Sequence, residues 1–251
     1  MLRFSDILYF VHSNLITRKM KKIKFIVLCL TLIMVPFLSS CIENDGSSSS
    51  SWDFSQCATV NQGYLGGSIT LLTDNGLTLT PTNPSYLKLT DGTYPTRIIG
   101  YYKLADGEVL KDGKTSYDVT IVSASVIVTK DFNQKSDTLK NSYNLTSIDA
   151  FYIANNYITV SLSFPYVNGK NVSFDMYKQK VGNDTLYVTL NYSNGGSTGT
   201  AYYQAEQIPY SFKMPTYIDD IQPKNDSIWV KISAKSTYET IVKSARCKYG
   251  Y

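Results

Sequence analysis

The sequence predicts an all-β protein, and three observations lead to that prediction. Beyond residue 52 the chain consists of short segments rich in Ile, Val, Tyr and Thr, which suit a pleated, half-buried sheet. One segment, residues 158–164, alternates apolar and polar residues without a break, as a strand with one buried and one solvent-facing side does. Turn signals such as Asp91-Gly92 and Asn168-Gly169 separate the segments at the spacing typical of sandwiches and barrels.

The segment before this β-region has the layout of a bacterial lipoprotein signal. Three lysines at Lys21, Lys22 and Lys24 form a positive n-region, and residues 25–37 form an uncharged apolar run that is short for a membrane-spanning helix. Leu38-Ser39-Ser40-Cys41 then resembles the lipobox of signal peptidase II substrates, whose cysteine thiol carries diacylglycerol. We expect residues 20–40 to be removed as a signal peptide and Cys41 to be lipidated. An ordinary secretory signal with an incidental cysteine is the alternative.

The residues on either side of this signal also carry information. Met20 starts a complete signal of its own, so we expect residues 1–19 to be an over-extended gene start. Residues 41–52 are polar and rich in Ser, which predicts a flexible tether. Glu43 and Asp45 in this tether resemble the surface-export signal of lipoproteins in the Bacteroidota, with a plain solvated linker as the alternative. The predicted location is the outer membrane, by a lipid anchor, on its periplasmic or surface side.

Cleavage would change the composition of the chain. Removing residues 1–40 takes away six of the 24 Lys and Arg residues and one of the 20 Asp and Glu residues, so 18 basic and 19 acidic residues remain. A near-neutral chain lacks the basic surface that nucleic-acid binding needs. His12, the only histidine, is removed as well. Without histidine the mature chain cannot form Ser-His-Asp or Cys-His machinery or a His-based metal site. We expect no cofactor, no metal and no nucleic acid.

The individual strands follow from turn signals and local composition. The first two, residues 68–73 and 76–80, flank Asp74-Asn75, a polar turn pair followed by glycine, and predict a hairpin. Residues 97–104 and 117–129 are rich in β-branched residues and tyrosine and have no helical period. The last segment, residues 238–248, fits a strand or a short helix. The remaining predicted strands are residues 158–164, 172–179, 185–192, 200–205, 210–214 and 227–233.

Several blocks of the sequence resemble the NigD-like lipoproteins of the Bacteroidota. They are Ala58-Thr59-Val60, Leu89-Thr90-Asp91-Gly92, Asp184-Thr185-Leu186 and residues 71–76, 81–83, 128–131, 153–158 and 211–214. Thr93-Tyr94-Pro95 and the missing histidines depart from the family pattern. The resemblance implies a small OB-like barrel at residues 53–133 and an antiparallel β-sandwich at residues 134–251, and the polar residues 131–142 predict the boundary. The family has no established catalytic residues to transfer.

Two cysteines and three hydroxyl residues are candidate modification sites. Cys57 and Cys247 can form a disulfide in an oxidising compartment, and two separate free thiols are the alternative. Three motifs of the form Asp-Ser/Thr-aliphatic resemble the O-glycosylation motif of exported proteins in the Bacteroides lineage. Their acceptors are Thr138, Thr185 and Ser227, and unmodified strand-entry turns are the alternative. Thr138 is the best candidate, because it lies in the predicted linker between the domains.

Tyrosine is unusually frequent, since 20 of the 21 tyrosines follow Cys41. In a pair such as Tyr101-Tyr102 the two side chains must point to opposite faces of a strand. An outward phenol suits glycan or protein recognition, although tyrosine is also simply a favoured strand residue.

The sequence therefore favours a non-catalytic cell-envelope lipoprotein that acts as a binding or accessory module for an envelope protein or a glycan. A structural or adhesive fimbria-associated lipoprotein is the first alternative. Fimbrial subunits of this lineage are typically matured at an early arginine, and Arg97 and Arg246 are the only arginines after Cys41, which disfavours this alternative. A carbohydrate-active enzyme with paired carboxylates such as Asp175 and Glu206 is the second alternative.

Overall fold

The computed structural model describes residues 52–63, 67–133, 143–169, 171–195 and 203–249, which all belong to one compact unit, Ser50–Tyr251. These residues form strands and turns, with one short 3-10 helix at Pro84–Leu87 and no α-helix among them. The all-β prediction is confirmed. Within the described ranges we find no helix with the length and hydropathy needed to cross a membrane.

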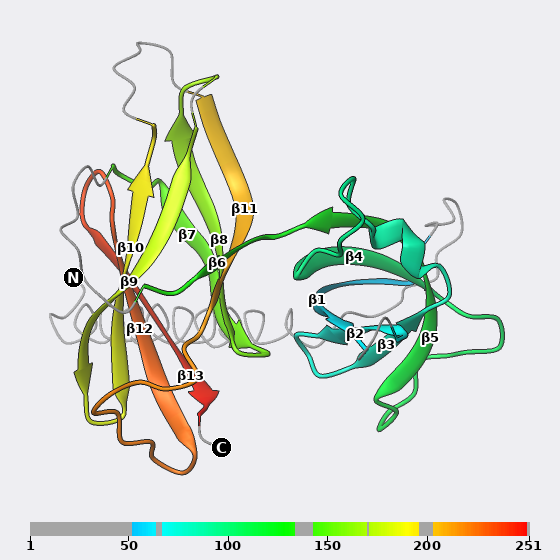
Figure 1. The fold of residues 1–251 in the computed structure, drawn as a ribbon. Helices are drawn as coiled ribbons and strands as arrows, with labels where there is room; N and C mark the ends of the chain where they lie inside the picture. The colour runs from blue at the N-terminus through cyan, green and yellow to red at the C-terminus, as the bar shows by residue number, and fades with distance from the viewer. Residues whose placement is uncertain (1–51, 64–66, 134–142, 170, 196–202, 250–251) are drawn as a thin grey trace, which may run out of the picture. The chain divides into compact units, whose positions relative to one another are not determined.

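The first domain is a closed five-stranded barrel (Figure 1). Its strands are β1 (Phe54–Gln62), β2 (Ile69–Thr73), β3 (Thr78–Pro81), β4 (Arg97–Leu104) and β5 (Ser116–Val126). Around the barrel they follow the order β1, β2, β3, β5, β4, and β4 pairs with β1 again. β3 and β5 run parallel, whereas the other neighbours run antiparallel. The barrel is the OB-like domain that the resemblance implies.

Apolar side chains from alternate strand positions fill the barrel. Leu71, Leu79 and Ile98 are among its fully buried members. Tyr102 is fully buried as well, and Gly100 makes room for it, because a Cβ at residue 100 would collide with the tyrosine ring. The neighbouring Tyr101 packs edge-on against Trp52 instead. The Tyr101-Tyr102 pair thus points to opposite faces, as predicted.

The second domain is a sandwich of two four-stranded sheets (Figure 1). Its strands are β6 (Val128–Asp131), β7 (Ser147–Ala154), β8 (Tyr157–Tyr166), β9 (Ser173–Gly182), β10 (Thr185–Ser193), β11 (Tyr203–Lys213), β12 (Ser227–Lys235) and β13 (Thr240–Lys248). One sheet has the order β13-β12-β10-β9, and the other has the order β6-β11-β8-β7. β10 runs parallel to β12, and β6 runs parallel to β11, so both sheets are mixed where the resemblance implied antiparallel ones. The C-terminal segment, left open between strand and helix, is a strand.

The sandwich core combines aliphatic and aromatic side chains. In β12 every second residue is buried, from Ile228 to Ala234. Phe174 packs against the rings of Phe164, Tyr192 and Tyr210, with ring centroids 4.5 to 4.9 Å apart. Such aromatic clusters bury large apolar area and favour one fixed packing.

The polar side of β8 was predicted to face solvent, but other parts of the chain cover it. Thr159 is 2% exposed and Ser163 is 6% exposed. Ser163 donates a hydrogen bond to Asp149 Oδ2 at 2.6 Å, and Thr159 contacts the barrel, as described below. The alternating pattern correctly predicted which residues share a side of the strand. It could not predict what covers that side.

The barrel ends at Val126 rather than at residue 133. Buried Ile127 is the only residue between β5 and β6. β6 pairs with β11 of the sandwich, and Phe132 packs into the sandwich core. The polar residues 131–142, which predicted a domain boundary, therefore begin at the last residue of β6 and end before β7, and both of these strands belong to the sandwich.

Candidate functional site

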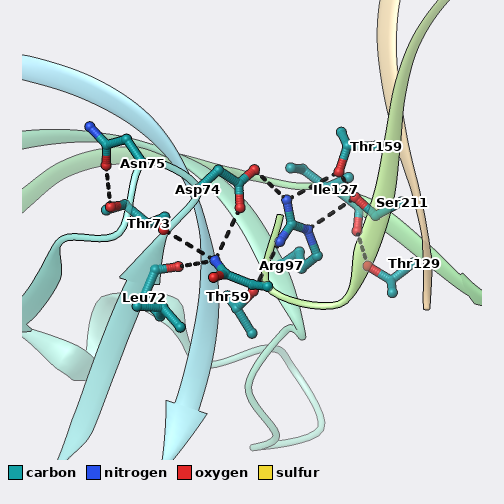
Figure 2. A network of polar contacts seen from close by, with 11 residues as sticks. Thr59, Leu72, Thr73, Asp74, Asn75, Arg97, Ile127, Thr129, Thr159 and Ser211 are labelled. Atoms are coloured by element: carbon teal, nitrogen blue, oxygen red, sulfur yellow. Dashed lines mark hydrogen bonds and ion pairs between the residues drawn. The ribbon is translucent and has the colours of Figure 1, made fainter. Parts of the chain in front are cut away.

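A buried polar network joins the barrel to the sandwich (Figure 2). Its centre is Arg97, the first residue of β4, whose side chain is fully buried. On the barrel side, Nη2 lies 2.6 Å from Asp74 Oδ2 and Nη1 donates to Thr59 Oγ1 at 2.9 Å. On the sandwich side, Nε donates to Ser211 Oγ at 3.0 Å and Nη2 to Thr159 Oγ1 at 3.2 Å. We call this network, together with Asn155, the barrel–sandwich junction.

Arg97 can be buried because its charge and its donors are matched. A buried guanidinium is costly unless it is both paired and hydrogen-bonded. Asp74, with a side chain 9% exposed, supplies the opposite charge, and the Tyr157 ring lies 4.8 Å from Arg97 Cζ. The backbone is fixed too, since Ile127 N donates to Arg97 O at 2.9 Å. Arg97 therefore links the two domains, because its side chain donates hydrogen bonds to residues of both.

Asn155 provides a second tie from the sandwich to the barrel. It lies in the turn between β7 and β8 with φ of +51°, a left-handed conformation that asparagine tolerates better than most residues. Its Nδ2 donates to Leu72 O at 3.0 Å, to Thr73 O at 3.1 Å and to Asp74 Oδ1 at 3.2 Å. Asp74 thus receives hydrogen bonds from both Arg97 and Asn155.

Cys57 and Tyr152 lie beside this junction and share a hydrogen bond. Burial raises the pKa of the Cys57 thiol, and the hydrogen bond from Tyr152 offsets part of that increase. Burial also raises the pKa of Tyr152. Because the thiolate is the nucleophilic form of cysteine, a raised pKa makes Cys57 a poor nucleophile at neutral pH.

The sandwich contains a cavity of about 470 Å³, which we call the sandwich pocket. Cavities of this size are typical of small-molecule sites. Among the described residues, Arg246 and Lys248 line the pocket and no acidic residue does. Asn155 belongs to both the pocket and the junction. The described residues that line it are Ile153, Ala154, Asn155, Asn156, Met214, Pro215, Thr216, Arg246, Cys247, Lys248 and Tyr249.

The predicted cysteine sites have different outcomes. Cys41 lies outside the described residues, so its lipidation stays a prediction. Cys57 and Cys247 are free thiols in the structure, and the disulfide between them is not formed. They lie in different domains, on β1 and β13. Cys247 packs against the sandwich core, and burial raises its pKa to about 11.

The predicted glycosylation sites also remain predictions. Thr138 lies outside the described residues, and it falls between β6 and β7 of the sandwich rather than between the domains. Thr185 and Ser227 are half-buried first residues of β10 and β12. Thr185 Oγ1 donates to Asp184 Oδ1 at 3.1 Å, and Ser227 Oγ donates to Asn225 O at 3.1 Å. These are the contacts of strand-entry turns.

The structure does not bring Asp175 and Glu206 together. Asp175 lies on β9 and pairs with Lys130 Nζ at 3.0 Å. Glu206 is exposed on β11, in the other sheet of the sandwich. Among the described residues there is no group of three or more His, Cys, Asp and Glu side chains that could hold a metal ion.

Sequence reasoning missed both the junction and the pocket. The sequence analysis considered Arg97 only in relation to fimbrial maturation, where its position disfavoured the fimbrial alternative. A local signal existed, because the charged Arg97 is the first residue of a predicted strand and directly precedes the apolar pair Ile98-Ile99. The partners could not be found, since Thr159 and Ser211 are 62 and 114 residues away along the chain.

No protein-family model matches this sequence, and no curated protein matches it. Solved structures match it at the level of fold. A protein described as toxin-related, from Parabacteroides distasonis, aligns with a TM-score of 0.59 and 13% identity over 78% of this chain and 93% of its own. A protein described as a lipoprotein, from Bacteroides fragilis, aligns with a TM-score of 0.53 and 14% identity over 78% of this chain and 98% of its own.

A NigD-like immunity protein from Bacteroides caccae aligns with a TM-score of 0.52 and 20% identity over 79% of this chain and 94% of its own. At such identities the likeness is one of fold. The barrel and sandwich of this chain are thus similar to those of a NigD-like protein, which confirms the resemblance predicted from the sequence.

Proposed function

We propose that this protein is a non-catalytic lipoprotein of the cell envelope, held at the outer membrane by lipid on Cys41, which binds a protein or glycan ligand at the sandwich pocket. The observation that carries the binding part is a pocket of about 470 Å³ whose wall includes Asn155, a residue fixed by three hydrogen bonds to the barrel. Preformed cavities are the usual sites of ligand binding. The lipobox and the polar tether support the anchoring part.

The junction also bears on the fimbrial alternative. Arg97 is fully buried at the barrel–sandwich junction, and its strand β4 pairs with β1, so a protease would have to separate these elements before it could cleave there. This supports a module that keeps its barrel intact over a subunit matured at Arg97. The descriptions toxin-related and immunity protein belong to the neighbours at 13% and 20% identity, and they differ from each other. Neither description enters the proposal.

Membrane fractionation of the full chain, expressed in a host that lipidates exported proteins, tests the anchoring part. We expect the wild-type protein in the membrane fraction with added lipid mass, and Cys41→Ala either released or left as uncleaved precursor. Cys57→Ala is the matched control and should fractionate like the wild type. Unchanged detergent partition and mass in Cys41→Ala would contradict the anchor.

Capture by the immobilised fragment Ser50–Tyr251 tests the binding part. Both described cores are built from residues of this fragment. Ala154→Leu should fill part of the pocket and reduce capture of envelope glycans or proteins relative to the wild type. Ala150→Leu, an exposed position on the same strand but outside the pocket, should leave capture unchanged. Equal capture by all three proteins would contradict binding at the pocket.

A further inference from the structure

The two sheets of the sandwich differ in charge. The strands of the sheet β13-β12-β10-β9 carry seven Lys and Arg residues and one acidic residue, Asp175, which is paired with Lys130. The strands of the other sheet, β6-β11-β8-β7, carry two basic and three acidic residues. All seven cations of the first sheet except Lys178 are exposed. In a chain that is near neutral after Cys41, positive charge is therefore concentrated on one sheet.

The outer face of this sheet places two aromatic rings among the cations. Every second residue of β12 is buried, so the exposed Trp229 and Lys231 between them point away from the core. Tyr187 of β10 pairs with Lys231 on one side and with Lys180 of β9 on the other, and Lys180 Nζ lies 4.8 Å from the centre of the Tyr187 ring. Arg246 of β13 lies directly opposite Trp229. We call these five residues the sheet platform.

The sheet platform extends across the whole width of the sheet. Its residues come from β9, β10, β12 and β13, so its cations spread over three strand spacings, or about 14 Å. Only Arg246 among them also lines the sandwich pocket. A broad face of this kind suits an extended anionic surface better than a single small anion. Trp and Tyr are the residues whose amphipathic rings sit at the headgroup level of membranes, and Lys and Arg are attracted to anionic lipids.

We infer that the sheet platform binds the anionic phospholipid headgroups of the membrane to which the chain is tethered. The predicted tether, residues 41–52, spans at most about 40 Å when fully extended, which keeps the folded unit close to the bilayer. This nearness favours a lipid surface over an acidic protein or polysaccharide as the occupant. The inference goes beyond the proposed function and uses its anchoring part only for the nearness of the membrane.

Co-sedimentation of the fragment Ser50–Tyr251 with lipid vesicles tests the inference, because this fragment lacks the anchor. Vesicles of phosphatidylcholine with about 30% phosphatidylglycerol supply anionic headgroups, and vesicles of phosphatidylcholine alone are the control. We expect binding to the anionic vesicles only. Binding should fall steeply at 1 M salt, where charges are screened beyond about 3 Å.

Charge variants locate the contact on the molecule. Lys180→Gln/Lys231→Gln removes the two cations that flank Tyr187 and should weaken binding to the anionic vesicles about thirtyfold. Lys103→Gln/Lys111→Gln is the matched control, since it removes the same charge from exposed positions of the first domain. This control should bind like the wild type.

Tryptophan fluorescence gives an independent readout, because the fragment has only two tryptophans, Trp52 and Trp229. Trp52→Phe leaves Trp229, whose emission should shift to shorter wavelength when anionic vesicles are added. Trp229→Phe leaves Trp52, which packs against Tyr101 outside the platform, and its emission should not change.

Three results would overturn the inference: equal binding to the two kinds of vesicle, equal losses in the two double variants, or a shift of Trp52 emission in place of Trp229 emission. Binding of the fragment to dextran sulfate but not to anionic vesicles would also overturn it and would indicate an acidic polysaccharide. These measurements do not involve Cys41 or Ala154, so the inference and the proposed function can fail independently.

Discussion

Arg97 and Arg246, the two arginines after Cys41, occupy opposite kinds of environment. Arg97 is fully buried, faces Asp74 at 2.6 Å, and donates to three further side chains. Arg246 is exposed on strand β13 and donates to one backbone carbonyl, Lys224 O. The first belongs to the barrel–sandwich junction and the second to the sandwich pocket.

The difference shows how surroundings decide what one residue type can do. Buried and fully matched, a guanidinium orders the side chains of two domains, and its charge is not available to a ligand. An exposed guanidinium with a single hydrogen bond adds little to stability, and its other N–H groups can still donate to an anion. Stability experiments can test this division.

The largest expected effect comes from Arg97→Ala. The substitution leaves Asp74, with a side chain 9% exposed, without its opposite charge, and breaking a buried ion pair from one side typically costs about 3–5 kcal/mol. Urea unfolding of the fragment Ser50–Tyr251 measures this loss. Arg246→Ala is the matched control, and it should change the free energy of unfolding by less than about 0.5 kcal/mol. Similar losses in the two variants would refute the contrast between the two arginines.

A smaller loss is expected at Asn155, which belongs to both regions. Asn155→Gly keeps the left-handed backbone conformation and removes the three hydrogen bonds to the barrel. We expect a loss of about 1–3 kcal/mol in the same urea experiment, because the partly buried acceptors Leu72 O and Asp74 Oδ1 lose a donor. Asn156→Gly is the control. Asn156 also has positive φ, at +63°, and is exposed, so this variant should unfold at nearly the wild-type urea concentration.

The pH dependence of stability sharpens the comparison at the pocket. Burial raises the pKa of Cys247 from 9.0 to about 11, so the folded state favours the neutral thiol. The resulting stabilisation is complete below pH 9 and is lost as pH rises to about 11. The urea midpoint should therefore fall over this range, and it should fall less in Cys247→Ala. Tyrosines titrate there too, so the difference between the two proteins is the relevant measurement, and parallel curves would contradict the assignment.

The smallest effect is expected for an ion pair that is only partly buried. Lys130 and Asp175 have side chains 33% and 32% exposed, and their atoms Nζ and Oδ1 are 3.0 Å apart. Exposed pairs typically contribute less than about 1 kcal/mol. Lys130→Met should therefore cost far less than Arg97→Ala, and the cost should shrink further at 1 M salt. A loss comparable to that of Arg97→Ala would show that burial is not the deciding factor.

Local pattern predicted much of the fold. The strand expected at residues 97–104 is β4, Arg97–Leu104, because its apolar residues, its tyrosines and the preceding turn agree. Strand β1, Phe54–Gln62, was not predicted as a strand, since its sequence FSQCATVNQ is largely polar and only Ala58 is fully buried. Its place is fixed by pairing with β2 and β4, which no local pattern encodes.

Strand β11 shows a different limit of prediction. Residues 200–205 and 210–214 were expected to be two strands, but Tyr203–Lys213 is one strand with an irregular register between Ala205 and Ile208. Gln207 has φ of +54° at this point, a left-handed conformation that interrupts the extended backbone of the strand. The irregular register breaks the alternation on which the prediction relied. The junction was beyond prediction for a related reason, since its partners meet only in the folded chain.

The position of strand β6 in the sandwich determines where a fragment that contains only the sandwich should begin. β11 has β6 on one side and β8 on the other, so a sandwich expressed from residue 134 onward would leave one edge of β11 without a partner. Open strand edges recruit other chains, and such a fragment should self-associate and precipitate at high concentration. A fragment that starts at Ile127 would keep its own edge strand and should remain monodisperse.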